Sequence, residues 1–279
     1  MSKNHIVAES YNLAVDMGFN RYLEEHATSE NSEIKIDEEK LLAEIEQNWL
    51  NSRLEQLEGI TPLEFISSIS TLEELIELFV DIASISDVGI PDIVLEKLKS
   101  YGKDAADKLF EFVQECMSVK DPGKVLAVSQ AVYTIGCLKS DEYKEKLIAL
   151  LLESFKDDFI SEAVCAAIVE YDAEILEDVI KAFHATQIPE VQEHLLACVG
   201  EIAKGNRSDE VFYFLKNAFR IVSNLKLAVE ILGDYGDGRA IPLLRGYILK
   251  NIKEMDKTTF NHMRAVIKKL GGEIDDLVY

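Results

Sequence analysis

The chain has 279 residues, 48% of them hydrophobic and 29% charged, which is enough to build a core in one elongated domain or in two compact ones. No apolar run approaches the roughly 20 residues that a membrane-spanning helix needs, and the N-terminal residues lack the apolar region of a secretory signal, so we expect a cytoplasmic protein. The net charge of −22 disfavours nucleic acid as a partner, because phosphates repel an acidic surface.

The acidic charge is concentrated at the N-terminal end. Residues 1–80 contain 17 acidic and 5 basic side chains, whereas residues 239–269 contain 2 acidic and 8 basic ones. The basic segment is therefore the one place at which local contact with phosphate would be favourable.

The N-terminal region is predicted to be helical. Residues 1–22 fit one helix whose common face carries apolar side chains: Ile6, Leu13, Ala14 and Met17. Residues 24–37 are polar and acidic, and we expect a solvated linker that proteases cut first. A second helix is expected over residues 38–50, with Trp49 on its apolar face.

A capped turn follows this second helix. Gly59 is expected to end a short helical piece, Thr61 to cap the next helix, Pro62 to occupy its first position and Glu64 to complete a capping box. The segment resembles a W-L…L-x-G-x-T-P-x-E helix–turn–helix that recurs in small bacterial helical domains. Two interpretations remain open: Trp49 packs under the turn as a structural residue, or Trp49, Thr61 and Pro62 form a docking site.

From about residue 90 the chain repeats. Turn markers at positions 102, 136, 172, 205, 236 and 271 are separated by 31 to 36 residues, and polar or proline turns lie between them. A period in this range indicates stacked helical repeats, and no segment has the alternation of a strand. We therefore expect an all-α fold with an N-terminal helical extension over residues 1–85 and a repeat region over residues 86–279.

The clearest repeat unit covers residues 229–244. Gly236 and Gly238 can end one helix and reverse the chain, and Asp237 can accept hydrogen bonds from the helix that follows. Its pattern, A-V-x-x-L-G-D…G-D-x-R-A-I-P-L-L, resembles a HEAT repeat, particularly the short bacterial form of phycobilisome-lyase-like proteins. This resemblance implies a right-handed α-solenoid of five to six helix pairs that presents an extended surface, usually to another protein.

No motif for catalysis or cofactor binding stands out. The chain has no H-E-x-x-H, P-loop, G-x-S-x-G or dinucleotide-binding fingerprint, and the glycine–aspartate turn at 233–238 lacks the oxygen pattern of a calcium loop. The four cysteines form no C-x-x-C pair and are predicted to be small buried apolar residues: Cys116, Cys137, Cys165 and Cys198. We expect no metal, no cofactor and no catalytic residue.

One set of charged residues follows the repeat. Positions at corresponding places in successive second helices change from acidic to basic along the chain: Glu111, Glu145, Lys181, Lys216 and Arg245. If these helices line the concave side of a solenoid, the charges form a groove that orients an elongated partner. The alternative is an ordinary solvated helix face.

The favoured hypothesis is a scaffold or adaptor that binds another protein and has no catalytic activity. A nucleic-acid-binding protein of the HEAT-like alkylpurine DNA glycosylase type is an alternative, although the overall charge opposes it and Trp49 lies outside the repeats. A lyase or chaperone for a chromophore-bearing protein is a further alternative that only the repeat subtype suggests. Fold resemblance alone does not decide among these classes or identify the partner.

Overall fold

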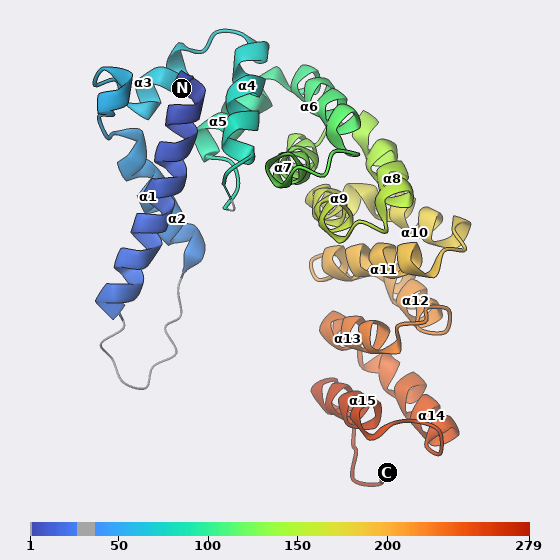
Figure 1. The fold of residues 1–279 in the computed structure, drawn as a ribbon. Coiled ribbons are helices and arrows are strands. Elements are labelled where there is room, and N and C mark those ends of the chain that lie inside the picture. Colours follow the sequence, from blue (N-terminus) through green and yellow to red (C-terminus); the bar gives the residue numbers. More distant parts are fainter. Residues whose placement is uncertain (1, 27–36, 87) are drawn as a thin grey trace. The chain divides into compact units, whose positions relative to one another are not determined.

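The computed structural model describes residues 2–26, 37–86 and 88–279, and within these ranges every regular element is a helix (Figure 1). The expectation of an all-α fold without strands is confirmed for this part of the chain. No helix in these ranges is long and apolar enough to cross a membrane.

The chain forms two compact units, Met1–Ser140 and Asp141–Tyr279. The elements of the first unit are α1 (Lys3–His26), α2 (Glu38–Leu50), η1 (Glu55–Leu57), α3 (Pro62–Ser68), α4 (Leu72–Ala83), α5 (Asp92–Tyr101), α6 (Lys103–Cys116) and α7 (Pro122–Leu138). Those of the second unit are α8 (Glu142–Ser154), α9 (Asp158–Glu170), η2 (Asp172–Ile175), α10 (Leu176–Ala185), α11 (Pro189–Ala203), α12 (Asp209–Ala218), α13 (Leu225–Tyr235), η3 (Gly238–Ala240), α14 (Ile241–Asn251) and α15 (Lys257–Lys269).

Helix α4 is central to the first unit, because it packs against α1 on one side and against α5, α6 and α7 on others. Its buried side chains include Leu75, Leu78 and Phe79, none of which is exposed. The predicted division between residues 85 and 86 falls just after α4 and thus lies within this unit. The division into compact units comes instead at residue 140, because the contacts of α4 extend across the predicted boundary.

Local sequence signals in the first unit act as expected. Helix α2 covers residues 38–50 as predicted, and Thr61 forms the predicted capping box with Glu64. The structure adds a second capping box, between Thr71 and Glu74 at the start of α4. The first helix is longer than predicted, because α1 continues to His26 and so includes residues 24–26 of the predicted linker. Asp37 caps α2, and residues 27–36 of that linker lie outside the described residues.

The turn markers lie at helix ends with one exception. Positions 102, 172, 205, 236 and 271 directly follow or separate helices, and Gly236 has the positive φ of 73° that a left-handed C-cap needs. The prediction of a break at Gly136 is wrong, because this glycine is buried in the last turn of α7. The helix ends two residues later at Leu138, and its C-cap Lys139 adopts the left-handed conformation with φ 50°.

The second unit has two layers of helices. Helices α9, α11, α13 and α15 pack successively against one another in one layer, and α8, α10, α12 and α14 cover them in the other (Figure 1). Helices on either side of the turns at Asp157, Pro189 and Asn224 pack together, whereas those around the marker at Gly236 make few contacts. The hairpins at Asp157 and Pro189 are therefore closely packed, whereas the turn at Gly236, the centre of the clearest repeat unit in the sequence, does not join a closely packed pair.

Close packing in the first of these layers depends on glycine. A Cβ atom on Gly200 of α11 would lie 2.9 Å from the side chain of Ile231 of α13, and one on Gly233 would lie 2.9 Å from Val266 of α15. Ala167, Gly200, Gly233 and Val266 follow one another at intervals of 33 residues. Small residues thus recur at one position of α9, α11 and α13, and Val266 at the same position of α15 packs on Gly233.

Candidate functional site

Four of the five predicted partner-binding residues lie in one layer of the second unit. Glu145 is on α8, Lys181 on α10, Lys216 on α12 and Arg245 on α14, one residue on each helix. The fifth, Glu111, is on α6 of the first unit, where it pairs with Lys108 at 2.9 Å. The four residues of the second unit thus belong to consecutive helices of the α8–α14 layer.

Two of the three basic members of this series, Lys181 and Arg245, have acidic neighbours. The ammonium group of Lys181 lies 2.7 Å from Glu177 and 3.7 Å from Asp178 on its own helix, and the hydrogen bond to Glu177 raises the pKa of Lys181. The guanidinium of Arg245 donates to the carboxylate of Asp276 and to the carbonyl of Glu273. The positive charge that these residues present to a partner is therefore smaller than the number of basic side chains suggests, most clearly at Arg245.

The sequence analysis did not connect Arg245 with the C-terminal segment. Asp276 is 31 residues away, so the two meet only because the chain after α15 returns to α14. The hydrogen bond from Arg245 lowers the pKa of the Asp276 carboxyl. The only sequence feature that pointed to this ion pair was an arginine followed about 30 residues later by two adjacent acids. Such a combination is too common in sequences to identify a contact.

Exposed apolar side chains accompany the charged residues on the same layer. Leu249 is 62% exposed and lies four residues after Arg245 on α14, and Tyr213 is 54% exposed and lies three residues before Lys216 on α12. The Lys216 ammonium stands 6.0 Å from the centre of the Tyr213 ring. Residues three and four apart share a helix face, so charged and apolar groups alternate over this surface.

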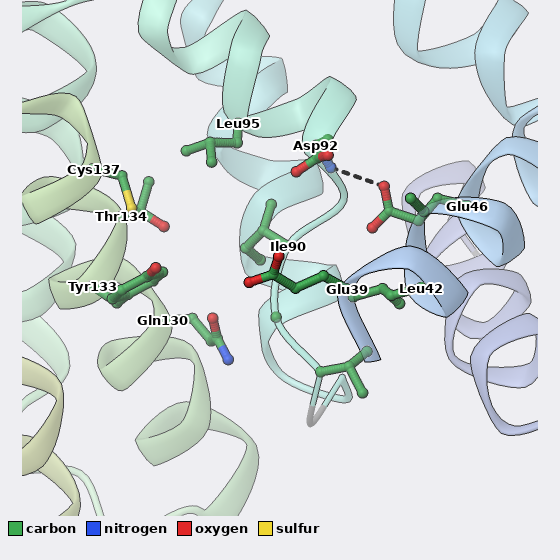
Figure 2. Close-up of a pocket in the computed structure, with 13 residues that line it drawn as sticks. Glu39, Leu42, Glu46, Ile90, Asp92, Leu95, Gln130, Tyr133, Thr134 and Cys137 are labelled. Carbon is green, nitrogen blue, oxygen red and sulfur yellow. Dashed lines mark hydrogen bonds between the residues drawn. The ribbon is translucent and has the colours of Figure 1, made fainter. Parts of the chain in front are cut away.

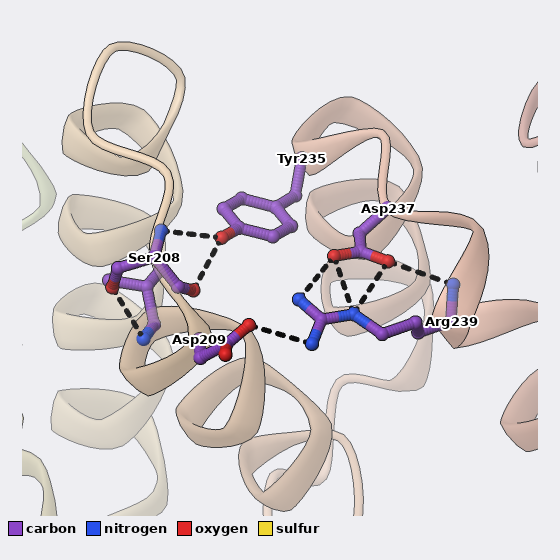
Figure 3. A network of polar contacts seen from close by, with 6 residues as sticks. Ser208, Asp209, Tyr235, Asp237 and Arg239 are labelled. Atoms are coloured by element: carbon purple, nitrogen blue, oxygen red, sulfur yellow. Dashed lines mark hydrogen bonds and ion pairs between the residues drawn. The ribbon is translucent and has the colours of Figure 1, made fainter.

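The turn between α13 and α14 is held to α12 by a polar network (Figure 3). Arg239 pairs with Asp237 and with Asp209, each at 2.7 Å, and its guanidinium carbon lies 4.2 Å from the centre of the Phe212 ring. Hydrogen bonding from Arg239 lowers the pKa of Asp237. The Tyr235 hydroxyl donates to the Ser208 carbonyl at 2.8 Å. The aspartate–arginine pair of the repeat motif therefore joins neighbouring helices of the stack.

Two cysteines and a histidine meet between α9 and α11. The Cys198 thiol lies 3.8 Å from the carbonyl oxygen of Cys165, and hydrogen bonding from Cys198, with a further contribution from His194, lowers the pKa of the Cys165 thiol. The hydrogen bond between His194 and Cys165 in turn raises the pKa of the His194 imidazole. Cys165 and Cys137 are half-buried, unlike the fully buried residues that the sequence analysis expected. The 33-residue spacing of Cys165 and Cys198 was the signal that it missed.

Trp49 lies on an apolar groove of the first unit. It is 3% exposed, its ring packs 5.0 Å from that of Tyr11, and its indole nitrogen donates to Ser10 at 2.9 Å. The groove has a volume of about 530 Å³, and its other apolar lining comes from α1 and from the segment after α2: Ile6, Leu13, Ala14, Met17 and Leu54. The face of α1 expected from the sequence is thus the groove face. Thr61 and Pro62 cap α3 and do not line this groove, so Trp49 is the one residue of the predicted docking turn that lies on it.

A second cavity of the first unit lies between α2, the loop before α5 and α7, with a volume of about 450 Å³ (Figure 2). Its acidic lining comes from Glu39, Glu46 and Asp92. Glu46 is 7% exposed and accepts hydrogen bonds from the Tyr11 hydroxyl at 2.9 Å and from the Asp92 backbone at 3.2 Å. Burial raises the pKa of Glu46. Because its carboxylate already holds α1 and the start of α5, we assign Glu46 to the architecture of the unit.

No protein-family model, curated protein or solved structure matches the chain. The HEAT-repeat resemblance thus stays a prediction, and the candidate surfaces are judged by their geometry. Among the described residues, no group of three or more histidine, cysteine or acidic side chains is arranged to hold a metal ion.

Proposed function

We propose that the chain is a non-catalytic scaffold that binds a partner protein, and that its second unit is a HEAT-like solenoid whose α8–α14 layer carries the binding surface. The observation that carries this proposal is the combination of exposed apolar and charged side chains on that layer. Tyr213 and Leu249 are more than half exposed and lie beside Lys216 and Arg245. Protein-binding surfaces combine apolar or aromatic anchors with a polar surround, and tyrosine and arginine are enriched among the anchors.

The solenoid part of the proposal is supported by the register of the other layer. Equivalent positions in α9, α11, α13 and α15 recur every 33 residues, and the helices approach closely at Gly200 and Gly233. Each hairpin then buries one side on its neighbour, as in repeat proteins in which every repeat contacts the next.

Packing also bears on which side of such a solenoid binds the partner. The helices of the α9–α15 layer contact one another more closely than α10 contacts α12 or α12 contacts α14. A bend in the stack would therefore place the α9–α15 layer inside. The α8–α14 layer would then lie on the outer side of the bend. We therefore propose that the binding surface is this layer itself, whereas the sequence-based expectation was a groove on the concave side.

Photo-crosslinking from the proposed surface tests this function. A benzophenone amino acid replaces Tyr213, which is exposed on α12, and in a second variant replaces Lys226, which is exposed on α13 of the other layer. In cells of the native host we expect a discrete adduct from position 213 that is absent from position 226. The same adducts from both positions, or none from position 213, would contradict the assignment.

A further inference from the structure

We infer that the first unit has a second docking surface, the groove between α1 and the segment after α2, and that its partner is a basic amphipathic helix. This surface is separate from the α8–α14 layer and does not depend on the function proposed for it. The inference rests on three properties of the groove: exposed apolar side chains, an apolar lining shared by two parts of the chain, and an acidic surround.

Two apolar side chains on the groove are largely exposed to solvent, although the other side of α1 is packed. Leu13 is 59% exposed and Met17 is 53% exposed, although α1 packs its opposite side against α2 and α4 with Val7, Ala8 and Tyr11 fully buried. Ile6, Leu13 and Met17 recur at helical spacing, with the small polar Ser10 between Ile6 and Leu13, so they form one stripe. An exposed apolar stripe beside a concave surface is a feature of interaction sites.

The apolar lining of the groove favours an amphipathic helix as the occupant. It comes from the stripe on α1 together with Trp49 and Leu54. An amphipathic helix that binds such a groove inserts side chains at positions i, i+3 or i+4 and i+7 into the apolar channel. Met17 adds a flexible, polarisable side chain that adapts to different anchors.

Charge decides which amphipathic helix fits. Glu9 lines the groove, Asp16 is exposed on α1 next to Met17, and Glu55 is exposed next to Leu54. Across residues 1–80, acidic side chains outnumber basic ones by 17 to 5. Lysine or arginine on the polar face of the partner would meet this acidic field, whereas a second copy of this acidic unit would be repelled.

The experiment uses the full-length protein and three synthetic 18-residue peptides. The first has leucines at helical spacing and lysines elsewhere, the second replaces the lysines by glutamates, and the third has the composition of the first in an order without an apolar face. Trp49 is the single tryptophan of the chain and lies on the groove, so its fluorescence reports occupancy, and calorimetry gives the affinity. We expect the basic amphipathic peptide to bind at least tenfold more tightly than the other two.

Variants locate the binding. Leu13→Glu with Met17→Glu should weaken the basic peptide at least tenfold as measured by calorimetry, and because both side chains are more than half exposed, the circular dichroism of the folded protein should be unchanged. Leu63→Glu is the matched control, because Leu63 is an exposed leucine on α3 outside the groove. Glu9→Lys with Asp16→Lys should weaken the basic peptide severalfold while the apolar stripe remains intact.

Each other outcome overturns the inference. Equal binding of the scrambled basic peptide would show that net charge alone attracts it, and equal binding of the acidic peptide would remove the charge argument. Retained binding by the Leu13→Glu, Met17→Glu variant would place the site elsewhere. No binding of the basic amphipathic peptide at 100-fold excess would show that the groove does not take such a helix. A dimer that dissociates in this variant, measured by sedimentation, would assign the groove to a second copy.

Discussion

The hydroxyl group of Tyr11 on α1 donates a 2.9 Å hydrogen bond to the carboxylate of Glu46 on α2, which is 7% exposed. The second carboxylate oxygen accepts from the backbone of Asp92 at the start of α5. One buried acid thus joins three helices of the first unit. Such a group is costly to bury, so its hydrogen bonds matter more to stability than those of surface residues.

We predict that Tyr11→Phe destabilises the first unit by about 1–3 kcal/mol at pH 7, because it leaves a buried carboxylate oxygen without its donor. Burial raises the pKa of Glu46 above its ordinary 4.5, so its contribution to stability is fully present below pH 4.5 and declines as the pH rises through the folded-state pKa. The Tyr11 hydrogen bond lowers that pKa, so the variant loses more stability over this range than the natural chain.

The measurement is urea denaturation followed by the fluorescence of Trp49, which lies in this unit. The difference between the natural chain and Tyr11→Phe should be larger at pH 7 than at pH 4. Tyr101→Phe is the control, because its hydroxyl makes only an exposed 3.4 Å contact with the carbonyl of Ser70. A loss of the same size at both pH values would contradict the role assigned to ionised Glu46.

A second prediction concerns the glycines of the second unit. Gly200→Ala should be neutral or destabilise by up to about 2 kcal/mol, because the overpacking cost of about 1–3 kcal/mol against Ile231 exceeds or cancels a gain of about 1 kcal/mol in helix propensity. Gly246→Ala in α14 has open space around its new methyl group and should stabilise by about 0.5–1 kcal/mol. Denaturation followed by circular dichroism measures both. Equal stabilisation by the two substitutions would show that α11 and α13 do not need the close approach.

Sequence reasoning succeeded where the signal was local. The capping box at Thr61 and the turn at Gly236 depend on residues within a few positions of one another, and the structure confirms both. Gly136 shows the limit of this reasoning, since a glycine can lie in a helix when its neighbours pack well and Lys139 provides the C-cap.

Long-range packing could not be read in the same way. The glycine markers locate turns, but which turns join tightly packed hairpins depends on contacts between helices. The charge series at Lys181 and Arg245 was found by spacing. The pairing of Lys181 with Glu177 is a local i,i+4 contact, whereas that of Arg245 with Asp276 depends on the return of the C-terminal segment. The 33-residue spacing of Cys165 and Cys198 was visible in the sequence, but its meaning required the packing of α9 on α11.

A third prediction is weak binding to DNA. The basic segment 239–269 is partly neutralised, because Arg239 pairs with Asp237 and Asp209, Arg245 with Asp276, and Lys269 with Asp234. We expect the full chain to bind a labelled DNA duplex more weakly than about 1 μM at physiological salt, the tight end of the non-specific range. Fluorescence anisotropy measures this affinity. Tighter binding would favour the glycosylase-like alternative over a protein-binding scaffold.

The last prediction concerns the charges on the α8–α14 layer. Once crosslinking has identified the partner, Lys181→Glu with Lys216→Glu should slow association on the order of tenfold at low salt, because exposed charges steer encounter more than they hold the complex. Lys226→Glu with Lys257→Glu makes the same change in net charge at exposed positions on α13 and α15 and is the control. Stopped-flow measurement should show the difference between the pairs shrinking as the Debye length falls from about 10 Å at 0.1 M salt to about 3 Å at 1 M. Because Glu177 and Asp178 already neutralise part of Lys181, Lys216→Glu alone should account for most of the slowing. Equal slowing by the two pairs would show that only total charge matters and that the α8–α14 layer does not orient the partner.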